Sequence, residues 1–276
     1  SKSFTSSIKL RYNREKDTLM EKDPLKEVDL IVRDRSKLMI MYFILFSITM
    51  LFGGLISAYI VSSTGQYWVH VTPPATLWIS NLLIIASSCT LVVSIKAMKS
   101  GNISKSRATL FLTMALGIGF AFTQIAGWNS VADNGSGWGT EANDEGLVAY
   151  SWNRIDDLIK SDAVYGEDYD VRINNLPLLY SPDSKELYSP NDPLMVKPIT
   201  SKVIHITNSS GSYLWVLMMI HILHFSFGLM YLFVNIYRVS NGTINPEDTI
   251  RLRVLGVYWH FLGGLWLLLF TMLFLL

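Results

Sequence analysis

The sequence predicts an all-α membrane protein: a five-transmembrane-helix bundle with a long extracytoplasmic loop between the third and fourth helices. Apolar residues make up 50% of the chain and charged residues only 16%, and all the charged residues fall in four segments. Five stretches without Asp, Glu, Lys or Arg separate those segments. Each stretch has about 20 residues or more, enough for a helix to cross a hydrocarbon core about 30 Å thick. Because lipid offers no hydrogen bonds to the backbone, each stretch is expected to be helical.

This pattern divides the chain into eight segments. They are a cytoplasmic N-terminal segment 1–37, a first span 38–61, a second span 75–96, a third span 107–128, an acidic external loop 129–211, a fourth span 212–238, a cytoplasmic loop 239–253 and a fifth span 254–276. The charged N-terminal segment contains no apolar stretch, so the first helix is expected to act as an uncleaved insertion signal. A soluble protein with five buried helices is the alternative, and five separate charge-free stretches argue against it.

The positive charges give the expected orientation. Ten Lys and Arg residues precede the first span, whereas the following loop, residues 62–75, has none. Lys96, Lys99, Lys105 and Arg107 surround the second loop, and Arg238, Arg251 and Arg253 lie at or in the fourth loop. Positive residues are retained on the cytoplasmic side of a membrane. The N-terminus and these two loops are therefore expected in the cytoplasm, and the C-terminus outside.

The external loop 129–211 differs from the rest of the chain in composition. It holds 13 acidic and six basic residues. Turn-forming pairs occur at Asn134-Gly135, Leu176-Pro177 and Ser181-Pro182. This composition predicts a small exposed subdomain or a segment that wraps a partner, with part of it in strands. Two interpretations stay open: a solvated insertion, or a docking surface for another subunit or a soluble electron carrier. The net charge of +1 suggests no nucleic-acid partner.

Within the spans, the ionisable side chains are three histidines, His221, His224 and His260. The first two lie about one turn apart on one helix, so they cannot ligate opposite faces of one haem iron. His260 is expected about 10 Å away from His224 in depth, at about 1.5 Å per residue. No carboxylate or thiolate lies near enough to complete a metal site. We therefore expect no catalytic residue, haem or metal in this chain, and imidazoles that hydrogen-bond to neighbouring helices or lipid headgroups.

Other residues of the spans indicate how the helices pack. Three polar side chains are expected to hydrogen-bond between helices: Asn81, Gln124 and Asn235. Small residues are expected where backbones approach closely, in particular Gly53, Gly54, Gly117, Gly119, Gly263 and Gly264. The one cysteine, Cys89, is expected to be buried as a small apolar residue.

Sequence motifs in the spans add a family resemblance. The last span reads Tyr258-Trp259-His260-Phe261, then Leu-Gly-Gly-Leu-Trp. The fourth has His221-x-x-His224-x-x-x-Gly228, and the first ends in Phe52-Gly53-Gly54. The third carries Gly117, Gln124 and Trp128, and the second opens with Pro73-Pro74. In this order the motifs closely resemble subunit III of haem-copper oxidases, the cytochrome c oxidase type, in the five-helix bacterial form.

The resemblance implies a non-catalytic subunit of the bacterial inner membrane that packs on and stabilises oxidase subunit I beside subunit II. Haem and copper would belong to those partner subunits. This chain would bind phospholipid and support proton uptake during aerobic respiratory electron transport, and its loop 129–211 could meet other respiratory complexes. A quinol oxidase of the same superfamily and, less so, a free-standing transporter are the alternatives.

The resemblance also implies roles for six residues. Helix–helix or lipid contacts would involve His221, His224, Trp259 and His260, and lipid phosphates would meet Arg251 and Arg253. The sequence departs from the family where relatives usually carry carboxylates, at Ile48, Gly263 and near Arg253. Roles assigned to those carboxylates in relatives do not carry over to this chain.

Overall fold

The computed structural model describes residues 24–65, 67–133, 138–142, 148–152, 155, 159, 164–204, 209–244 and 249–275. The chain divides into two compact units, Ser1–Ser47 and Ile48–Leu276. Helix α2, Pro24–Ser63, supplies the described part of the first unit and continues into the second. Of the predicted cytoplasmic segment 1–37, residues 1–23 lie outside the described part.

Five helices are long and apolar enough to cross a membrane in the described part of the chain, which confirms the predicted fold class. Besides α2 they are α3 (Ala75–Lys99), α4 (Ile103–Asp133), α7 (Ser209–Ser240) and α8 (Ile250–Phe274). Most of them extend past the predicted spans by several residues, since charged residues at a helix end still favour helix once they reach water. A short helix α6, Thr200–Val203, precedes α7.

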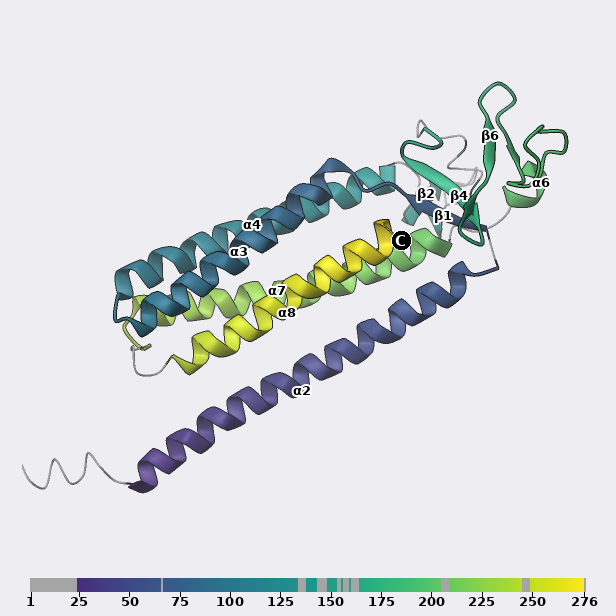
Figure 1. The fold of residues 1–276 in the computed structure, drawn as a ribbon. Helices are drawn as coiled ribbons and strands as arrows, with labels where there is room; N and C mark the ends of the chain where they lie inside the picture. Colours follow the sequence, from purple (N-terminus) through teal and green to yellow (C-terminus); the bar gives the residue numbers. More distant parts are fainter. Residues whose placement is uncertain are drawn as a thin grey trace, which may run out of the picture. The chain divides into compact units, whose positions relative to one another are not determined.

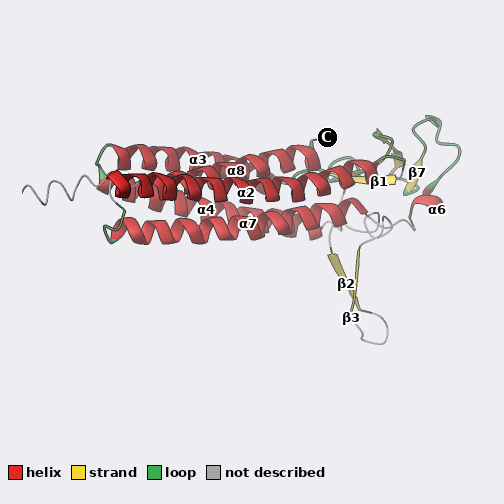
Figure 2. Cartoon of the chain, turned by 90° about the horizontal axis from the view of Figure 1, so that it is seen from below, coloured by secondary structure: helices red, strands yellow, loops and turns green. Residues whose placement is uncertain are grey.

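Within the second unit, α3 and α4 form an antiparallel hairpin beside α7 and α8 (Figures 1 and 2). Gly101, with φ of +79°, makes the tight turn of the hairpin, a conformation that favours glycine. Helix α8 contacts both α3 and α7, and it has the largest buried share of the five spans, 50%. The core of this unit therefore lies along α8, where Trp259 and Trp266 are fully buried.

Hydrogen bonds between polar side chains join α3 to its two neighbours. Gln124 Nε2 of α4 donates to Ser80 Oγ of α3 at 2.7 Å. Trp266 Nε1 of α8 donates to Asn81 Oδ1 of α3 at 2.7 Å. The predicted interhelical roles of Asn81 and Gln124 are thus confirmed. The prediction for Asn235 is wrong, because its side-chain amide donates to the carbonyl of Tyr231 on its own helix.

Glycines mark close contacts at some predicted positions and not at others. A Cβ atom added at Gly117 would lie 2.9 Å from Trp259 Cη2, and one at Gly263 would lie 3.3 Å from Ile84 Cγ1. An added Cβ at Gly53, Gly54 or Gly264 would meet nothing within 4 Å, so these three do not mark close contacts among the described residues. Cys89 is exposed on α3 rather than buried, because it points away from the other helices of its unit.

The connections at one end of the helices form strands. The strands are β1 (Tyr67–Val71), β2 (Trp138–Ala142), β3 (Val148–Trp152), β4 (Tyr169–Ile173), β5 (Leu176–Pro177), β6 (Leu179–Ser181) and β7 (Glu186–Tyr188). They make an antiparallel sheet β1-β4-β5 and two hairpins, β2-β3 and β6-β7. Figure 2 shows β2 and β3 side by side. The strand content expected of the loop 129–211 is present in its described residues. Its sheet also recruits β1, from the loop after the first span.

One turn differs from its sequence-based prediction. Leu176-Pro177, predicted as a turn, is strand β5, and the turn before it is Asn174-Asn175, whose φ values are 50° and 65°. Positive φ at both central residues is typical of a tight two-residue hairpin turn and is well tolerated by asparagine. The pair Asn134-Gly135 lies outside the described residues.

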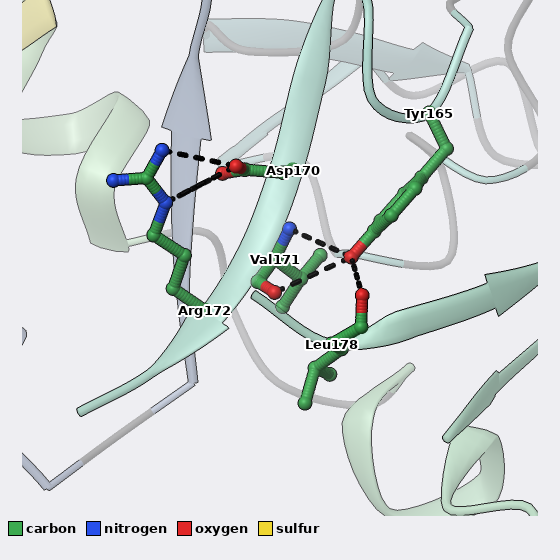
Figure 3. Close-up of polar contacts among 5 residues, drawn as sticks. All are labelled: Tyr165, Asp170, Val171, Arg172 and Leu178. Carbon is green, nitrogen blue, oxygen red and sulfur yellow. Dashed lines mark hydrogen bonds and ion pairs between the residues drawn. The ribbon is translucent and has the colours of Figure 1, made fainter. Parts of the chain in front are cut away.

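The phenol of Tyr165 connects the strands of this sheet. Its hydroxyl donates to the carbonyl of Leu178 at 2.9 Å and accepts from the backbone N–H of Val171 at 3.3 Å (Figure 3). Burial raises the pKa of Tyr165 to about 12, against a smaller lowering by the hydrogen bond to Val171. Burial raises the pKa of Tyr169 as well.

This raised pKa predicts a loss of stability at high pH. An unfolded tyrosine loses its proton near pH 10, whereas folded Tyr165 keeps it to about pH 12. The unfolded state therefore releases its proton first, and the free energy of unfolding falls as the pH rises from 10 towards 12. Tyr165→Phe should make this fall shallower, without abolishing it because Tyr169 contributes too. Urea unfolding followed by near-ultraviolet circular dichroism at several pH values measures it. Tyr237→Phe, at an exposed position, is the control and should leave the fall unchanged; an equal effect of both variants would contradict the assignment.

Candidate functional site

His221 lies at the centre of an aromatic cluster in the second unit. Its side chain is only 1% exposed. The centroid of its ring lies 5.4 Å from that of Trp266 and 6.4 Å from those of Phe52, Phe120 and Phe225. These rings come from four helices: α2, α4, α7 and α8. His221 and Phe225 are four residues apart on α7, a spacing that places them on one face of the helix. The imidazole therefore packs as one of several flat rings.

Neither ring nitrogen of His221 has a hydrogen-bond partner among the described protein groups. The expectation that this imidazole bonds to a neighbouring helix is therefore wrong. The rings around it are those of three phenylalanines and of Trp266, and the indole N–H of Trp266 donates to Asn81 instead. A buried polar atom without a partner costs roughly 1–3 kcal/mol.

We therefore expect His221→Leu to keep or raise the stability of the protein, because leucine fills a similar volume without a buried polar atom. The midpoint of thermal unfolding in mild detergent measures this. The matched variant His224→Leu removes an imidazole that does have a partner, and it should lower the midpoint. A large drop for His221→Leu, comparable to that of a core truncation, would show that the imidazole makes a polar contact in the working protein.

His224 lies one turn further along α7 and is half-buried. Its Nδ1 lies 2.8 Å from the carbonyl oxygen of Ile220 on the same helix. The centroid of its ring lies 5.9 Å from that of Phe52. The carbonyl oxygen of His224 accepts a hydrogen bond from the hydroxyl of Tyr258 at 3.0 Å, which joins α7 to α8. His224 thus contacts both α2 and α8.

Trp259 occupies the middle of α8 and is fully buried. Its indole Nε1 donates to Ser87 Oγ of α3 at 3.1 Å, and its ring lies 5.2 Å from that of Phe225 of α7. Gly117 of α4 faces the far edge of the indole. One side chain therefore contacts three other helices, and none of it is free to meet lipid.

His260 follows Trp259 in the chain but faces away from the core, because adjacent residues on a helix point in different directions. It is exposed and lines a groove of about 380 Å³ between α2 and α8. The groove residues are Thr49, Phe52, Gly53, Ile56, His260, Phe261, Gly264, Leu265 and Leu268. They are apolar except for Thr49 and His260. The two glycines leave room above the backbone, since an added Cβ at either would meet nothing within 4 Å.

The two arginines named from the sequence lie at the start of α8, at the end of the helix remote from the strands. Arg251 is half-buried, and its carbonyl oxygen lies 3.4 Å from the hydroxyl of Tyr231 on α7. Arg253 is exposed. The structure does not bring these two arginines next to the aromatic cluster around His221. In the described part of the chain, no group of three His, Cys, Asp or Glu side chains could hold a metal ion.

The groove and the aromatic cluster share one residue that the sequence did not single out for a role, Phe52. It contacts His221 and His224 on one side and lines the groove on the other. The sequence pattern that could have indicated this role is the Gly53-Gly54 pair after Phe52. Because the two glycines lack side chains, they leave space beside the phenyl ring. Chemically, this arrangement can pack helices and hold an apolar chain.

Comparison with known proteins gives a local similarity. No family model matches the chain. Over 56 residues the chain is 34% identical to the cytochrome bo(3) ubiquinol oxidase subunit 3 of Pseudomonas putida. The match spans 20% of this chain and 27% of that protein. The described part of the chain thus has five helices that could cross a membrane, and 56 residues of the chain are similar to subunit 3 of a ubiquinol oxidase.

Proposed function

We propose that this chain is subunit III of a bacterial haem-copper oxidase and that it supports catalysis without carrying it out. The observation that carries the proposal is the use of the motif Tyr258-Trp259-His260-Phe261. Two of its four residues, Tyr258 and Trp259, hydrogen-bond between helices, and the other two, His260 and Phe261, line an apolar groove. The local similarity to an oxidase subunit 3 supports the same conclusion.

In this role the aromatic cluster fixes the helices, and the outer faces of the helices meet subunit I and lipid. The end of α2 within the second unit exposes large apolar side chains, including Met50, Leu51 and Val61. Helices without side chains at Gly53 and Gly54 allow another helix or an acyl chain to approach closely. Haem and copper belong to subunits I and II. Phospholipid in the groove at His260, and at Arg251 and Arg253, stabilises the assembly and supports proton uptake by subunit I.

The electron donor separates two versions of this proposal. The motifs of the spans resemble the cytochrome c oxidase type, and we propose cytochrome c as the donor. The similar protein from Pseudomonas putida is a ubiquinol oxidase subunit, which favours quinol as the second candidate. The donor binds other subunits, so a subunit II with copper or haem c in the purified assembly would select cytochrome c. A subunit II without either would select quinol.

Affinity purification of the tagged chain from membranes in mild detergent tests the proposal. We expect it to bring down haem- and copper-containing subunits, visible by absorption spectroscopy and mass spectrometry. Recovery of the chain alone as a stable monomer would overturn the proposal.

A pair of variants tests which face meets the partner. Gly53→Leu fills the groove and should reduce the haem recovered per chain. Phe122→Leu, at a 70% exposed position of α4, is the control and should not. If Gly53→Leu recovers as much haem as the control, the groove is not the partner face, although the subunit assignment would stand on the purification itself.

A further inference from the structure

A second pocket lies at the strand-bearing end of the bundle, away from all six residues discussed above. It has a volume of about 250 Å³. Its lining comes from the end of α2, from β1, from β4 and its turn, and from the end of α8: Tyr59, Ile60, Ser63, Trp68, His70, Arg172, Asn174, Asn175 and Met272. The pairing of β1 with β4, in which His70 faces Asp170 and Trp68 faces Arg172, brings these distant segments together.

The pocket has an apolar part and a polar part. The helices α2 and α8 contribute Ile60 and Met272 where their apolar spans end. The strands contribute the polar side chains of His70 and Arg172, and the turn after β4 contributes that of Asn175. A ligand that matches both parts is amphipathic, with its polar end among the strands and its apolar end beside the helices.

The polar part offers hydrogen-bond donors. The indole N–H of Trp68, a side chain that is only 7% exposed, makes no hydrogen bond of standard geometry among the described residues, although the hydroxyl of Tyr59 lies near it in the same pocket. Arg172 uses Nε and Nη2 to hold Asp170 at 3.0–3.1 Å, as Figure 3 shows, and this leaves Nη1 for another acceptor. Asn174 accepts from the backbone N–H of Gly65 through Oδ1, so its amide N–H₂ remains a donor. The ligand's polar end therefore needs several acceptor oxygens.

The charge of the pocket is close to balanced. The carboxylate of Asp170 compensates the guanidinium of Arg172. Burial lowers the pKa of His70, and the neighbouring Arg172 lowers it further, so the imidazole is neutral at pH 7. The pocket is close to neutral, rich in donors and bordered by an apolar wall. A small free anion would leave that wall without a contact, whereas a phosphodiester attached to hydrocarbon would contact both parts.

We propose that this pocket binds the phosphodiester headgroup of a membrane phospholipid, with Trp68, Arg172 and the Asn174-Asn175 turn around the phosphate and the acyl chains beside Ile60 and Met272. The site extends the lipid-binding part of the proposed function to the opposite end of the bundle from Arg251 and Arg253. It rests on the pocket alone and does not require that the chain belongs to an oxidase.

Photolabelling in native membranes tests this proposal on the protein as it is assembled. The probe is a phosphatidylethanolamine with a diazirine on its headgroup, and mass spectrometry maps the labelled peptides. We expect labels on the peptides around residues 59–70 and 172–175, and we expect unlabelled phosphatidylethanolamine to compete with the probe. Diacylglycerol, which has the same chains without phosphate, should not compete, and neither should inorganic phosphate.

Two variants probe the donors without disturbing the backbone. Trp68→Phe removes the indole N–H and keeps an aromatic ring, and Asn175→Gly removes the amide at a residue whose φ of +65° glycine tolerates. Each should weaken probe binding about tenfold, the effect of losing one hydrogen bond to a charged acceptor. Trp78→Phe, at an exposed tryptophan outside the pocket, is the control.

Any of four results would overturn the proposal. They are unchanged labelling in both pocket variants, equal competition by diacylglycerol, equal competition by inorganic phosphate, and labels confined to other peptides. These outcomes do not depend on whether oxidase subunits are present in the assembly, so the pocket is tested separately from the proposed function.

Discussion

Replacing Gly127 with valine is expected to prevent α3 and α4 from packing and to leave little folded protein in the membrane. A Cβ atom at Gly127 would lie 2.5 Å from Leu77 Cδ2, 2.8 Å from Leu77 Cγ and 3.0 Å from Thr76 Oγ1. Leu77 is fully buried, so its branch cannot move away without displacing a further side chain. Forcing one or more carbons into a packed core typically costs about 1–3 kcal/mol each, and domains have only about 5–15 kcal/mol in total.

The measurement is the yield of membrane-extracted protein and its midpoint of thermal unfolding. Gly127→Ala should lower the midpoint, and Gly127→Val should lower both the midpoint and the yield. Gly264→Val is the matched control on α8, because an added Cβ there would meet nothing within 4 Å. Equal losses for Gly127→Val and Gly264→Val would mean that valine acts through helix propensity, not through the contact with Leu77.

The sequence predicts the five helices well because one physical requirement dominates them. Charged side chains are excluded from lipid, so the charge-free stretches locate the spans without knowledge of tertiary contacts. The same requirement does not predict the residue at which each helix begins or ends. Helix α4, for instance, begins at Ile103, before the predicted start at 107, because Lys105 and Arg107 are helical at a position where water is available.

Packing is less predictable, because it depends on which helix face meets which neighbour. Gly53 and Gly127 look alike in the sequence, yet an added Cβ at Gly53 meets nothing within 4 Å and one at Gly127 meets a buried leucine. His221 shows the same limit. Its neighbours in space come from three other helices, and their aromatic character leaves the imidazole without a partner.

The pocket at the strands could not be predicted for a related reason. Trp68 and Arg172 are paired across β1 and β4 but lie far apart in the sequence. Strand pairing over such a separation leaves no periodic signal in either loop. The composition of the loop 129–211 indicated only that part of it forms strands, not that residues 67–71 complete its sheet.

Replacing Trp259 with alanine should have the second large effect, because this side chain fills the space between α3, α4 and α7. Removing a buried tryptophan costs about 3–5 kcal/mol. It also removes the donor that lies 3.1 Å from Ser87 Oγ. The midpoint of thermal unfolding should fall sharply. His260→Ala, one residue further along α8 in the apolar groove, should leave the midpoint of the detergent-solubilised protein nearly unchanged.

A double-mutant cycle assigns part of this effect to one contact. An added Cβ at Gly117 would lie 2.9 Å from Trp259 Cη2 and 3.1 Å from Cζ2, atoms that phenylalanine lacks. Gly117→Ala should therefore destabilise the native protein, and it should do so much less when Trp259→Phe has vacated that space. The two changes should be coupled by about 0.5–3 kcal/mol, the range for residues in contact. The same cycle with Trp266→Phe should be nearly additive, since the atoms nearest to Gly117 belong to Trp259 and Leu229. Additivity in both cycles would contradict the contact between Gly117 and Trp259. If the cycles differ as expected, the missing side chain on α4 is what allows Trp259 of α8 to pack in the core of this unit.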